Sequence, residues 1–357
     1  MTKLLIDYDP LLYSAGSVGE TRSIHVVHRA SGDEYEFANR TAFYGHHKAK
    51  AGGYLAEYNL GKSAEKRRRP EDFDITDIQT PEPIANCLHT LKRMIEGAKE
   101  AVGAKTHYGY TGKGKTFRED LATVWGYKAN RVGMMRPFHL DDMKEYLVKH
   151  HACTIITGIE ADDACTMDGY RDWQKWKKTK SDNDKTILLF SDKDYRGTVG
   201  HIYNISGKEE VSSFDGLGKL WLREDGDVTG RGRMFLYYQV LSSDVADNYA
   251  ANSASDVKWG SKSAYKLLAG CRTDKEALEA VVKGYKLLYP SPRKIIGWRG
   301  YQDPKRTILK ENSSEFEIEV DWLYMMKENF ALAHMQRWEN DRLDVPAILS
   351  KLNIGSQ

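Results

Sequence analysis

Four short acid-rich segments, strung in a fixed order along the 357 residues, constrain this chain more than any other feature. They are residues 6–9, 158–163, 191–194 and 244–248. Three of them follow apolar, strand-like runs, and the fourth falls in a stretch that we predict to be helical. Carboxylates gathered at strand ends cannot all ionise side by side without a counter-charge. Hard divalent cations such as Mg²⁺ or Mn²⁺ supply that charge, so the segments predict metal-assisted chemistry on phosphates.

The chain alternates predicted strands with predicted helices over its first 205 residues. Apolar runs at 4–6, 105–110, 153–157 and 186–191 predict strands, and amphipathic patterns predict helices at 83–102, at 138–150 and from Glu160 onwards. This alternation predicts an α/β fold with a mostly parallel sheet flanked by helices. A hairpin is expected over 23–37, and 38–82 is expected to be an irregular polar excursion.

The sheet pattern fades after about residue 205, and the rest of the chain is predicted to be mainly helical. Helices are expected over 234–270, with a loop at 252–262, and over 274–289 and 321–340.

The acid-rich segments place several carboxylates at predicted strand ends, where ligands of an open α/β sheet gather. Asp7 follows the first strand, and Asp192 and Asp194 lie two apart beyond the strand at 186–191, so an extended backbone points both to one side. Three further acids stand at a predicted helix start: Glu160, Asp162 and Asp163. Asp244 and Asp247 are three apart and would share a helix face. Each segment alone is more often a solvated helix start or a turn, but their order and number favour one metal site.

A basic and aromatic stretch lies between the strand at 105–110 and the helix at 138. Its side chains are Lys113, Lys115, Phe117, Arg118, Trp125, Tyr127, Lys128 and Arg131. This mixture suits phosphate contacts combined with base stacking. For the basic run at 66–69 we favour an ordinary solvated loop.

Composition excludes several classes of function. The 53 basic and 51 acidic residues leave a net charge of +2, which excludes a uniformly basic coat but allows acids in a site and bases around it. The four cysteines lack any zinc-ligand spacing and fit a reducing cytoplasm. No signal peptide and no 18-residue apolar run is found, so no membrane partner is expected.

Together these motifs resemble the flap endonuclease or 5′→3′ exonuclease family, particularly the bacteriophage exonucleases and the 5′-nuclease domain of bacterial DNA polymerase I. The matching pieces are Ile-Asp-Tyr-Asp at 6–9, Phe-Arg at 117–118, Tyr-Lys-Ala-Asn-Arg at 127–131, Gly-Ile-Glu-Ala-Asp-Asp at 158–163, Ser-Asp-Lys-Asp at 191–194 and Asp-Val-Ala-Asp-Asn at 244–248. They span about residues 4 to 270. Glu-Ala-Asp-Asp followed at this distance by Ser-Asp-Lys-Asp is the most specific part of the resemblance.

The resemblance implies a domain organisation. It implies a PIN-like nuclease core over 1–205 with a helical arch around 111–136, a helical region over 206–290 that grips duplex DNA through a helix–loop–helix, and a C-terminal extension over 291–357.

It also implies roles for individual residues. Two Mg²⁺ ions, for which Mn²⁺ can substitute, would be held by Asp7, Glu160, Asp162, Asp163, Asp192, Asp194, Asp244 and Asp247. Lys128 and Arg118 would contact the scissile phosphate. DNA would be contacted by Arg131, Tyr127, Lys113, Lys115 and Lys262, and the loop at 255–262 would hold a phosphate or a monovalent cation.

The chain departs from the family pattern at four points, one of which is a longer insertion at 38–82. The family's aspartate after the strand at 105–110 is missing, which leaves Asp9 as a substitute ligand. Ser243 stands where the family has glycine, and the glycine-rich loop keeps only Gly260, beside Trp259.

The sequence therefore predicts a metal-dependent 5′→3′ exonuclease or 5′-flap endonuclease that leaves 5′ phosphates. Its expected partners are DNA with 5′ ends or flaps, RNA primer–DNA hybrids and replication proteins, in the cytoplasm of a bacterial host if the chain is phage-encoded. Three alternatives stay open: a PIN-type ribonuclease, a non-catalytic DNA-binding protein of the same fold, and a phosphatase-like hydrolase of a small substrate.

Overall fold

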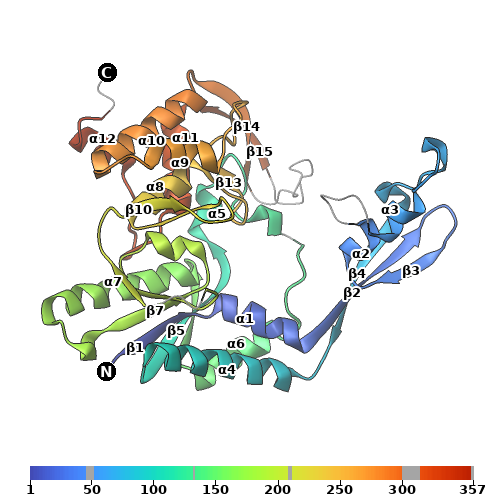
Figure 1. The fold of residues 1–357 in the computed structure, drawn as a ribbon, viewed down its shortest axis with the longest axis horizontal. Helices are drawn as coiled ribbons and strands as arrows, with labels where there is room; N and C mark the ends of the chain where they lie inside the picture. Colours follow the sequence, from blue (N-terminus) through green and yellow to red (C-terminus); the bar gives the residue numbers. More distant parts are fainter. Residues whose placement is uncertain (46–51, 132, 208–210, 300–313, 355–357) are drawn as a thin grey trace. The chain divides into compact units, whose positions relative to one another are not determined.

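A computed structural model describes residues 1–45, 52–131, 133–207, 211–299 and 314–354 (Figure 1). The chain divides into two compact units. The larger unit comprises Met1–Pro10, Met94–Met135 and Lys144–Gln357, and the smaller comprises Leu11–Arg93 and Arg136–Met143. The larger unit runs across the boundaries predicted near residues 205 and 290.

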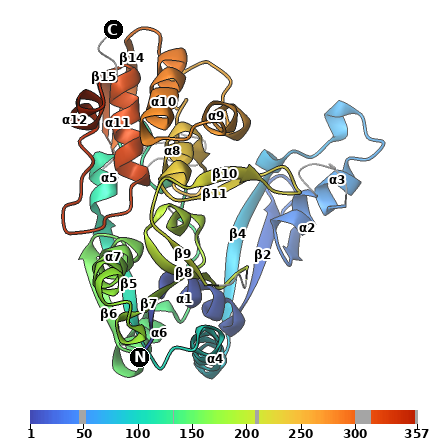
Figure 2. The same ribbon diagram turned by 60° about the vertical axis from the view of Figure 1, so that its left-hand side comes forward.

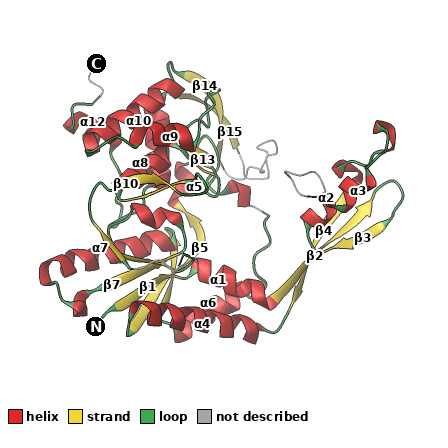
Figure 3. Cartoon of the chain, viewed as in Figure 1, coloured by secondary structure: helices red, strands yellow, loops and turns green. Residues whose placement is uncertain are grey.

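The larger unit is built on a six-stranded sheet with the strand order β6-β5-β1-β7-β8-β9 (Figure 3). The strands are β1 (Lys3–Asp7), β5 (Thr106–Thr116), β6 (Cys153–Gly158), β7 (Thr186–Phe190), β8 (Gly200–Asn204) and β9 (Ser212–Phe214). All neighbours are parallel except β8 and β9. The central strands β1 and β7 are buried along nearly their whole length, as expected of a parallel sheet covered on both faces. The predicted α/β class is confirmed.

One long helix covers one face of this sheet. Helix α7 (Ala161–Thr179) packs over β1, β5, β7 and β8. The parts of α4 (Ile84–Val102) and α6 (Leu140–His150) that belong to the larger unit lie on the other face (Figures 1 and 2). The first turn of α7 and the ends of β1 and β7 therefore meet at one edge of the sheet.

A second layer of the larger unit is helical and shares one apolar core. Its helices are α8 (Arg233–Leu241), α9 (Ser261–Leu268), α10 (Asp274–Leu288), α11 (Trp322–Ala333) and α12 (Val345–Lys351). Thr273 and Glu276 form a capping box that fixes the start of α10. Two antiparallel hairpins accompany the helices, β10 (Lys219–Leu222) with β11 (Val228–Arg231), and β14 (Arg293–Arg299) with β15 (Ser314–Val320).

The smaller unit has its own sheet and its own core. Strand β2 (Glu20–His28) pairs with β3 (Glu34–Phe37), as the predicted hairpin requires, and also with β4 (Phe73–Pro81). Helix α1 (Asp9–Gly16) leads into it, and α2 (Arg40–Tyr44) and α3 (Tyr54–Tyr58) help to enclose a buried cluster of Ile24, Val26, Phe43, Leu55 and Phe73. The expectation of an irregular excursion over 38–82 is therefore wrong for its described residues.

Three further local expectations differ from the structure. Strand β5 does not end at residue 110 but continues to Thr116, because it keeps pairing with β6 beyond a register shift. The described residues of 111–136 hold the end of β5, a short helix α5 (Phe117–Leu121) and a 3₁₀ turn at Ala129–Arg131, rather than a long helical arch. The acidic segment at 244–248 is not helical: it is the turn between β12 (Ser243–Asp244) and β13 (Tyr249–Ala250).

Among the residues that the structure describes, no helix is long and apolar enough to cross a bilayer.

Candidate metal centre

Six predicted ligands lie in two groups of three carboxylates within the larger unit. In each group, one oxygen from every member lies within 4.8 Å of the others. Glu160, Asp162 and Asp163 form the first group. Asp194, Asp244 and Asp247 form the second group. The structure thus brings together acids from three segments that are far apart in the sequence.

The first group sits at the N-terminus of α7. Glu160 occupies the N-cap position, and Asp162 and Asp163 lie in the first turn, where the helix dipole favours negative charge. One oxygen of Asp162 accepts a hydrogen bond of 2.6 Å from the backbone N–H of Asp163, but the carboxylate has no ion pair among the described residues. Burial, followed by repulsion from Glu160 and Asp163, raises the pKa of Asp162 well above its ordinary value.

Arg118 neutralises the rest of the first group. Its guanidinium hydrogen-bonds to both oxygens of Asp163 and, at 3.0 Å, to Oε2 of Glu160. The remaining donors reach the backbone oxygens of Leu332 and His334, at 3.0 and 2.8 Å. The side chain is only 2 % exposed and every N–H direction is used, so Arg118 faces protein rather than solvent.

Asp163 is equally enclosed. Its carboxylate is fully buried, and it also accepts a hydrogen bond of 2.9 Å from the backbone N–H of Gln336. Of the first group, Asp162 is therefore the member without a cationic partner among the described residues.

Asp7, at the end of β1, lies near Asp9 and Asp192. Its carboxylate accepts hydrogen bonds from the backbone N–H of Asp9, at 3.1 Å, and from the hydroxyl of Tyr195, at 3.2 Å. Burial raises the pKa of Asp7 to about 8, and repulsion from Asp9 and then Asp192 adds to the shift. A buried carboxyl with such a shift has no sufficient counter-charge, and a bound cation would supply one.

The second group joins the loop after β7 to the turn at 244–248. Asp192 caps the 3₁₀ turn at Lys193–Gly197 by accepting from the backbone N–H of Asp194. Asp244 is buried and accepts from the backbone N–H groups of Ala246 and Asp247, at 2.9 and 3.2 Å. These backbone bonds fix the orientation of both carboxylates.

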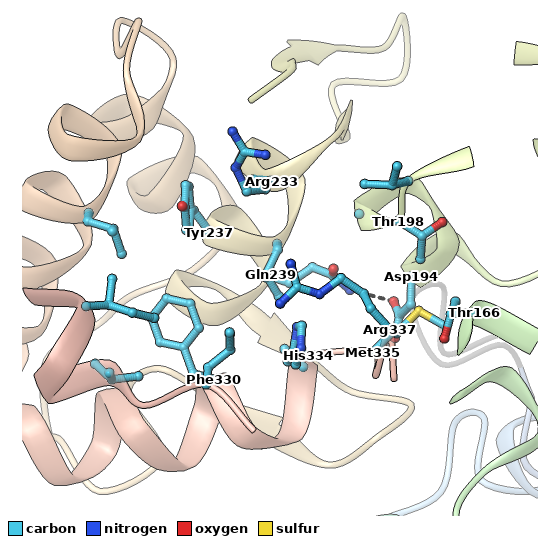
Figure 4. A pocket seen from close by; sticks show the side chains of 18 of the residues that line it. Thr166, Asp194, Thr198, Arg233, Tyr237, Gln239, Phe330, His334, Met335 and Arg337 are labelled. Atoms are coloured by element: carbon cyan, nitrogen blue, oxygen red, sulfur yellow. Dashed lines mark hydrogen bonds between the residues drawn. The ribbon is translucent and has the colours of Figure 1, made fainter. Parts of the chain in front are cut away.

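Asp194 faces α8 and a cavity. Figure 4 shows its carboxylate beside Gln239, whose amide donates a hydrogen bond to it. Asp194 and Gln239 line a cavity of about 280 Å³ together with Phe330 and Met335. All four side chains are labelled in the same view. Burial, followed by repulsion from Asp192, raises the pKa of Asp194 to about 7.

Tyr127 and Lys128 connect the two groups. The Tyr127 hydroxyl lies 2.9 Å from Oε2 of Glu160 and 2.7 Å from Oδ2 of Asp247. The Lys128 ammonium pairs with Glu160 and lies 3.5 Å from Asp247. Burial alone would raise the pKa of Asp247, but Lys128, Tyr127 and Arg131 together lower it.

The backbone at Lys128 is unusual and supports this arrangement. Lys128 has φ of 52°, in the left-handed region that a non-glycine residue rarely adopts, and its N–H donates to the carbonyl of Asp247. Arg131 donates to the same Asp247 carboxylate at 3.0 Å and to the carbonyl of Ala246. The basic segment at 127–131 is thus folded onto the acidic turn.

Asp9 lies against strand β5, next to Thr111 and Gly112. Its carboxylate accepts hydrogen bonds from the Thr111 hydroxyl and, at 3.2 Å, from the backbone N–H of Gly112, both on β5. The carboxylate of Asp9, which follows β1 in the sequence, therefore lies at the middle of β5. Whether Asp9 binds a metal stays a prediction.

The remaining predicted contacts lie outside the two groups. Lys113 and Lys115 are exposed on the end of β5, and Lys115 pairs with Asp120. Lys262 lies in the first turn of α9. In the loop at 255–262, the Trp259 indole donates to the carbonyl of Leu241. The roles of these residues in binding DNA or a monovalent ion stay predictions.

Sequence reasoning missed several residues that shape this centre. Lys193 lies within the acidic segment at 191–194 and Tyr195 follows it, so the adjacent acids could have indicated that both residues lie near the site. Gln239 and the segment 332–336, which encloses Arg118 and Asp163, carry no such signal, because only the folded chain brings them here.

The donor set fits a divalent cation. It consists of carboxylate oxygens, which Mg²⁺ and Mn²⁺ prefer, and Asp7 and Asp162 lack a cationic partner among the described side chains. Carboxylates from the ends of β1 and β7, the start of α7 and the turn at 244–248 can hold such an ion.

Comparisons with known proteins add only a partial likeness. No protein-family model and no curated protein sequence matches the chain. Among solved structures, it is similar to the D15 protein of T5 crystallised with metal ions (15 % identity, TM-score 0.36), which covers 56 % of this chain and 82 % of that one. It is also similar to a mutant of the T5 5′-exonuclease, with 15 % identity and a TM-score of 0.36, over 57 % of this chain and 70 % of that one. A third match is a T5 D15 flap endonuclease complex with DNA and metal ions, with 14 % identity and a TM-score of 0.36, over 58 % of this chain and 81 % of that one. Likeness at this TM-score carries no information on activity. The function proposed below is therefore inferred from the residues of the site.

Proposed function

We propose that this protein is a metal-dependent nuclease that hydrolyses DNA phosphodiesters from a 5′ end and cuts 5′ flaps. One observation carries the proposal: two groups of three carboxylates, linked by Tyr127 and Lys128, lie in one unit with Asp7, which has no cationic partner among the described residues. Such a set would be strongly self-repelling without bound cations.

Two divalent cations, most simply Mg²⁺, would activate the attacking water and stabilise the leaving oxygen of the phosphodiester. Asp7, Glu160 and Asp162 would hold one ion, with Asp192 near it, and Asp194, Asp244 and Asp247 would surround the other. The products would carry 5′ phosphates.

Lys128 is our candidate for the scissile phosphate. It is partly exposed, and its ammonium contacts Glu160 of the first group and Asp247 of the second, so a phosphate bound at this centre would lie near its positive charge. A positive charge at that place stabilises the negative charge that develops during cleavage. Arg118 is proposed instead as a positioning residue, since its donors are taken by Asp163, Glu160 and backbone oxygens.

The proposal is tested with a 5′-flap DNA duplex labelled at either end, incubated with Mg²⁺ or with EDTA. A single strand of RNA with the same sequence is run in parallel. We expect short products from the 5′ end of the DNA in Mg²⁺ alone. Cleavage of the RNA but not the DNA would favour the ribonuclease alternative, and DNA binding without cleavage in any divalent metal would favour the non-catalytic one.

A further inference from the structure

The Lys193 ammonium lies inside the second carboxylate group. Its Nζ is 3.0 Å from Oδ1 of Asp194 and donates a hydrogen bond to Oδ2 of Asp244. These are two of the three members of that group. The Lys193 side chain is still 50 % exposed, whereas the Asp244 side chain is only 4 % exposed. A flexible cation thus bridges two fixed anions.

The charges of the two groups differ once the cations are counted. In the second group, Lys193 pairs with Asp194 and Asp244, while Lys128 and Arg131 pair with Asp247. Lys128 is shared, because it also pairs with Glu160, so only Lys193 and Arg131 pair with the second group alone.

In the first group, Arg118 pairs with Glu160 and Asp163, and Lys128 pairs with Glu160. Among the described residues, neither Asp162 nor Asp7 has a cation at ion-pair distance. Apart from the shared Lys128, the first group has one cation against three carboxylates and the second has two, so the first group keeps more uncompensated negative charge.

From this difference we propose that Lys193 is a built-in competitor for one of the two divalent cations, so that the second carboxylate group binds a metal more weakly than the first. The proposal rests on the metal chemistry proposed above. A divalent cation held between Asp194 and Asp244 needs the oxygens that the ammonium bridges, and two cations cannot share that position. Lys193 must rotate away first, which its half-exposed, four-carbon stem allows.

The inference is tested by measuring Mn²⁺ binding, without DNA, by isothermal titration calorimetry and by the electron paramagnetic resonance signal of free Mn²⁺. The proteins compared are the wild type, Lys193→Met and Lys193→Arg. We expect one stronger and one weaker site in the wild type. In Lys193→Met the weaker site should tighten by about tenfold or more, because a unit positive charge next to the ion is removed. Lys193→Arg should keep the weak site weak.

Two further variants make the assignment specific. Lys283→Met removes an exposed lysine of α10 and should leave both Mn²⁺ constants unchanged. Asp244→Asn, introduced into Lys193→Met, should abolish the tightened site. Its side-chain oxygen can still accept the backbone N–H groups of Ala246 and Asp247, so the turn should be kept.

Unchanged Mn²⁺ constants in Lys193→Met would overturn the inference. So would loss of the weaker site in that variant, because Lys193 would then support the cation rather than compete with it. Because Mn²⁺ binding is read without cleavage, the two proposals fail separately. A protein that binds Mn²⁺ as stated but cuts no DNA would contradict the proposed function and leave the role of Lys193 intact.

Discussion

At the scale of single residues, the candidate centre contains carboxylates of two kinds. The Asp163 carboxylate pairs with Arg118. The Asp247 carboxylate is compensated by Lys128 and Arg131 and accepts a hydrogen bond from Tyr127. Asp7 is buried and Asp162 is half-buried, neither has a cationic partner among the described residues, and the pKa of each is raised. Evenly compensated charges would indicate a structural network, whereas buried acids left without partners indicate a site for an added cation.

Replacing Lys128 separates its chemical role from metal binding. We expect Lys128→Ala to slow single-turnover cleavage by about a hundredfold or more, because a charge near the reacting phosphate is lost. Mn²⁺ affinity should fall little or even rise, since Glu160 and Asp247 would lose a competing cation. Single-turnover kinetics at saturating Mg²⁺, beside Mn²⁺ calorimetry, measure both. A normal cleavage rate would remove Lys128 from the mechanism.

At the scale of elements, Arg118 joins parts of the chain that are more than 200 residues apart. It belongs to α5, pairs with the first turn of α7, and donates to carbonyls at and just beyond the end of α11. Thr166 of α7 also donates to the carbonyl of Gln336, at 2.7 Å. The segment that follows α11 is therefore part of the wall behind the first carboxylate group.

Breaking this junction should cost stability as well as activity. Arg118→Met leaves the buried Asp163 carboxylate without its partner, which typically costs about 3–5 kcal/mol of unfolding free energy. Urea unfolding should show this loss, and the double variant Arg118→Met with Asp163→Asn should recover part of it. If Arg118→Met were as stable as the wild type, Arg118 would not hold this junction together.

Element prediction from the sequence succeeded where a local pattern agreed with the tertiary environment. The strands β1, β6 and β7 and the helices α4, α6 and α7 follow directly from apolar runs and amphipathic spacing. The turn at 244–248 falls inside the helix predicted over 234–270, and the spacing of Asp244 and Asp247 agreed with that wrong prediction. In the structure, that spacing instead lets Asp244 accept the backbone N–H groups of Ala246 and Asp247.

The candidate site was predictable in its acids and less so in its partners. Acids at strand ends are visible in the sequence. The enclosure of Arg118 depends on a distant segment, residues 332–336, and nothing local signals it. The extension of β5 likewise depends on its pairing with β6 and not on its own polar sequence.

At the scale of the whole molecule, the centre lies entirely in the larger unit. The protonation of its carboxylates therefore changes the unfolding free energy of that unit. Without a divalent cation, we expect stability to fall as pH rises from about 4 to about 8. The pKa of Asp7 is raised from 3.8 to about 8 and that of Asp194 to about 7, so the folded protein binds more protons than the unfolded chain across this range.

Adding Mg²⁺ should reverse this trend at the upper end of the range. The melting temperature should rise with Mg²⁺ at pH 8 and change little at pH 5, where a cation must displace protons. Differential scanning fluorimetry in EDTA and in Mg²⁺ across pH 5–8 measures this, with Ca²⁺ as a second divalent ion. A melting temperature that does not respond to any divalent cation at pH 8 would argue against a metal centre.

The most direct test of the central claim is single-turnover cleavage of 5′-flap DNA by the wild type and by Asp162→Asn. The substitution removes one charge from the first carboxylate group while keeping an oxygen that can accept from the backbone N–H of Asp163. We predict that cleavage in Mg²⁺ falls by about a hundredfold or more, that DNA binding is kept, and that the melting temperature in EDTA does not fall. Cleavage by Asp162→Asn at the wild-type rate would contradict the assignment of this site as the metal centre of a nuclease.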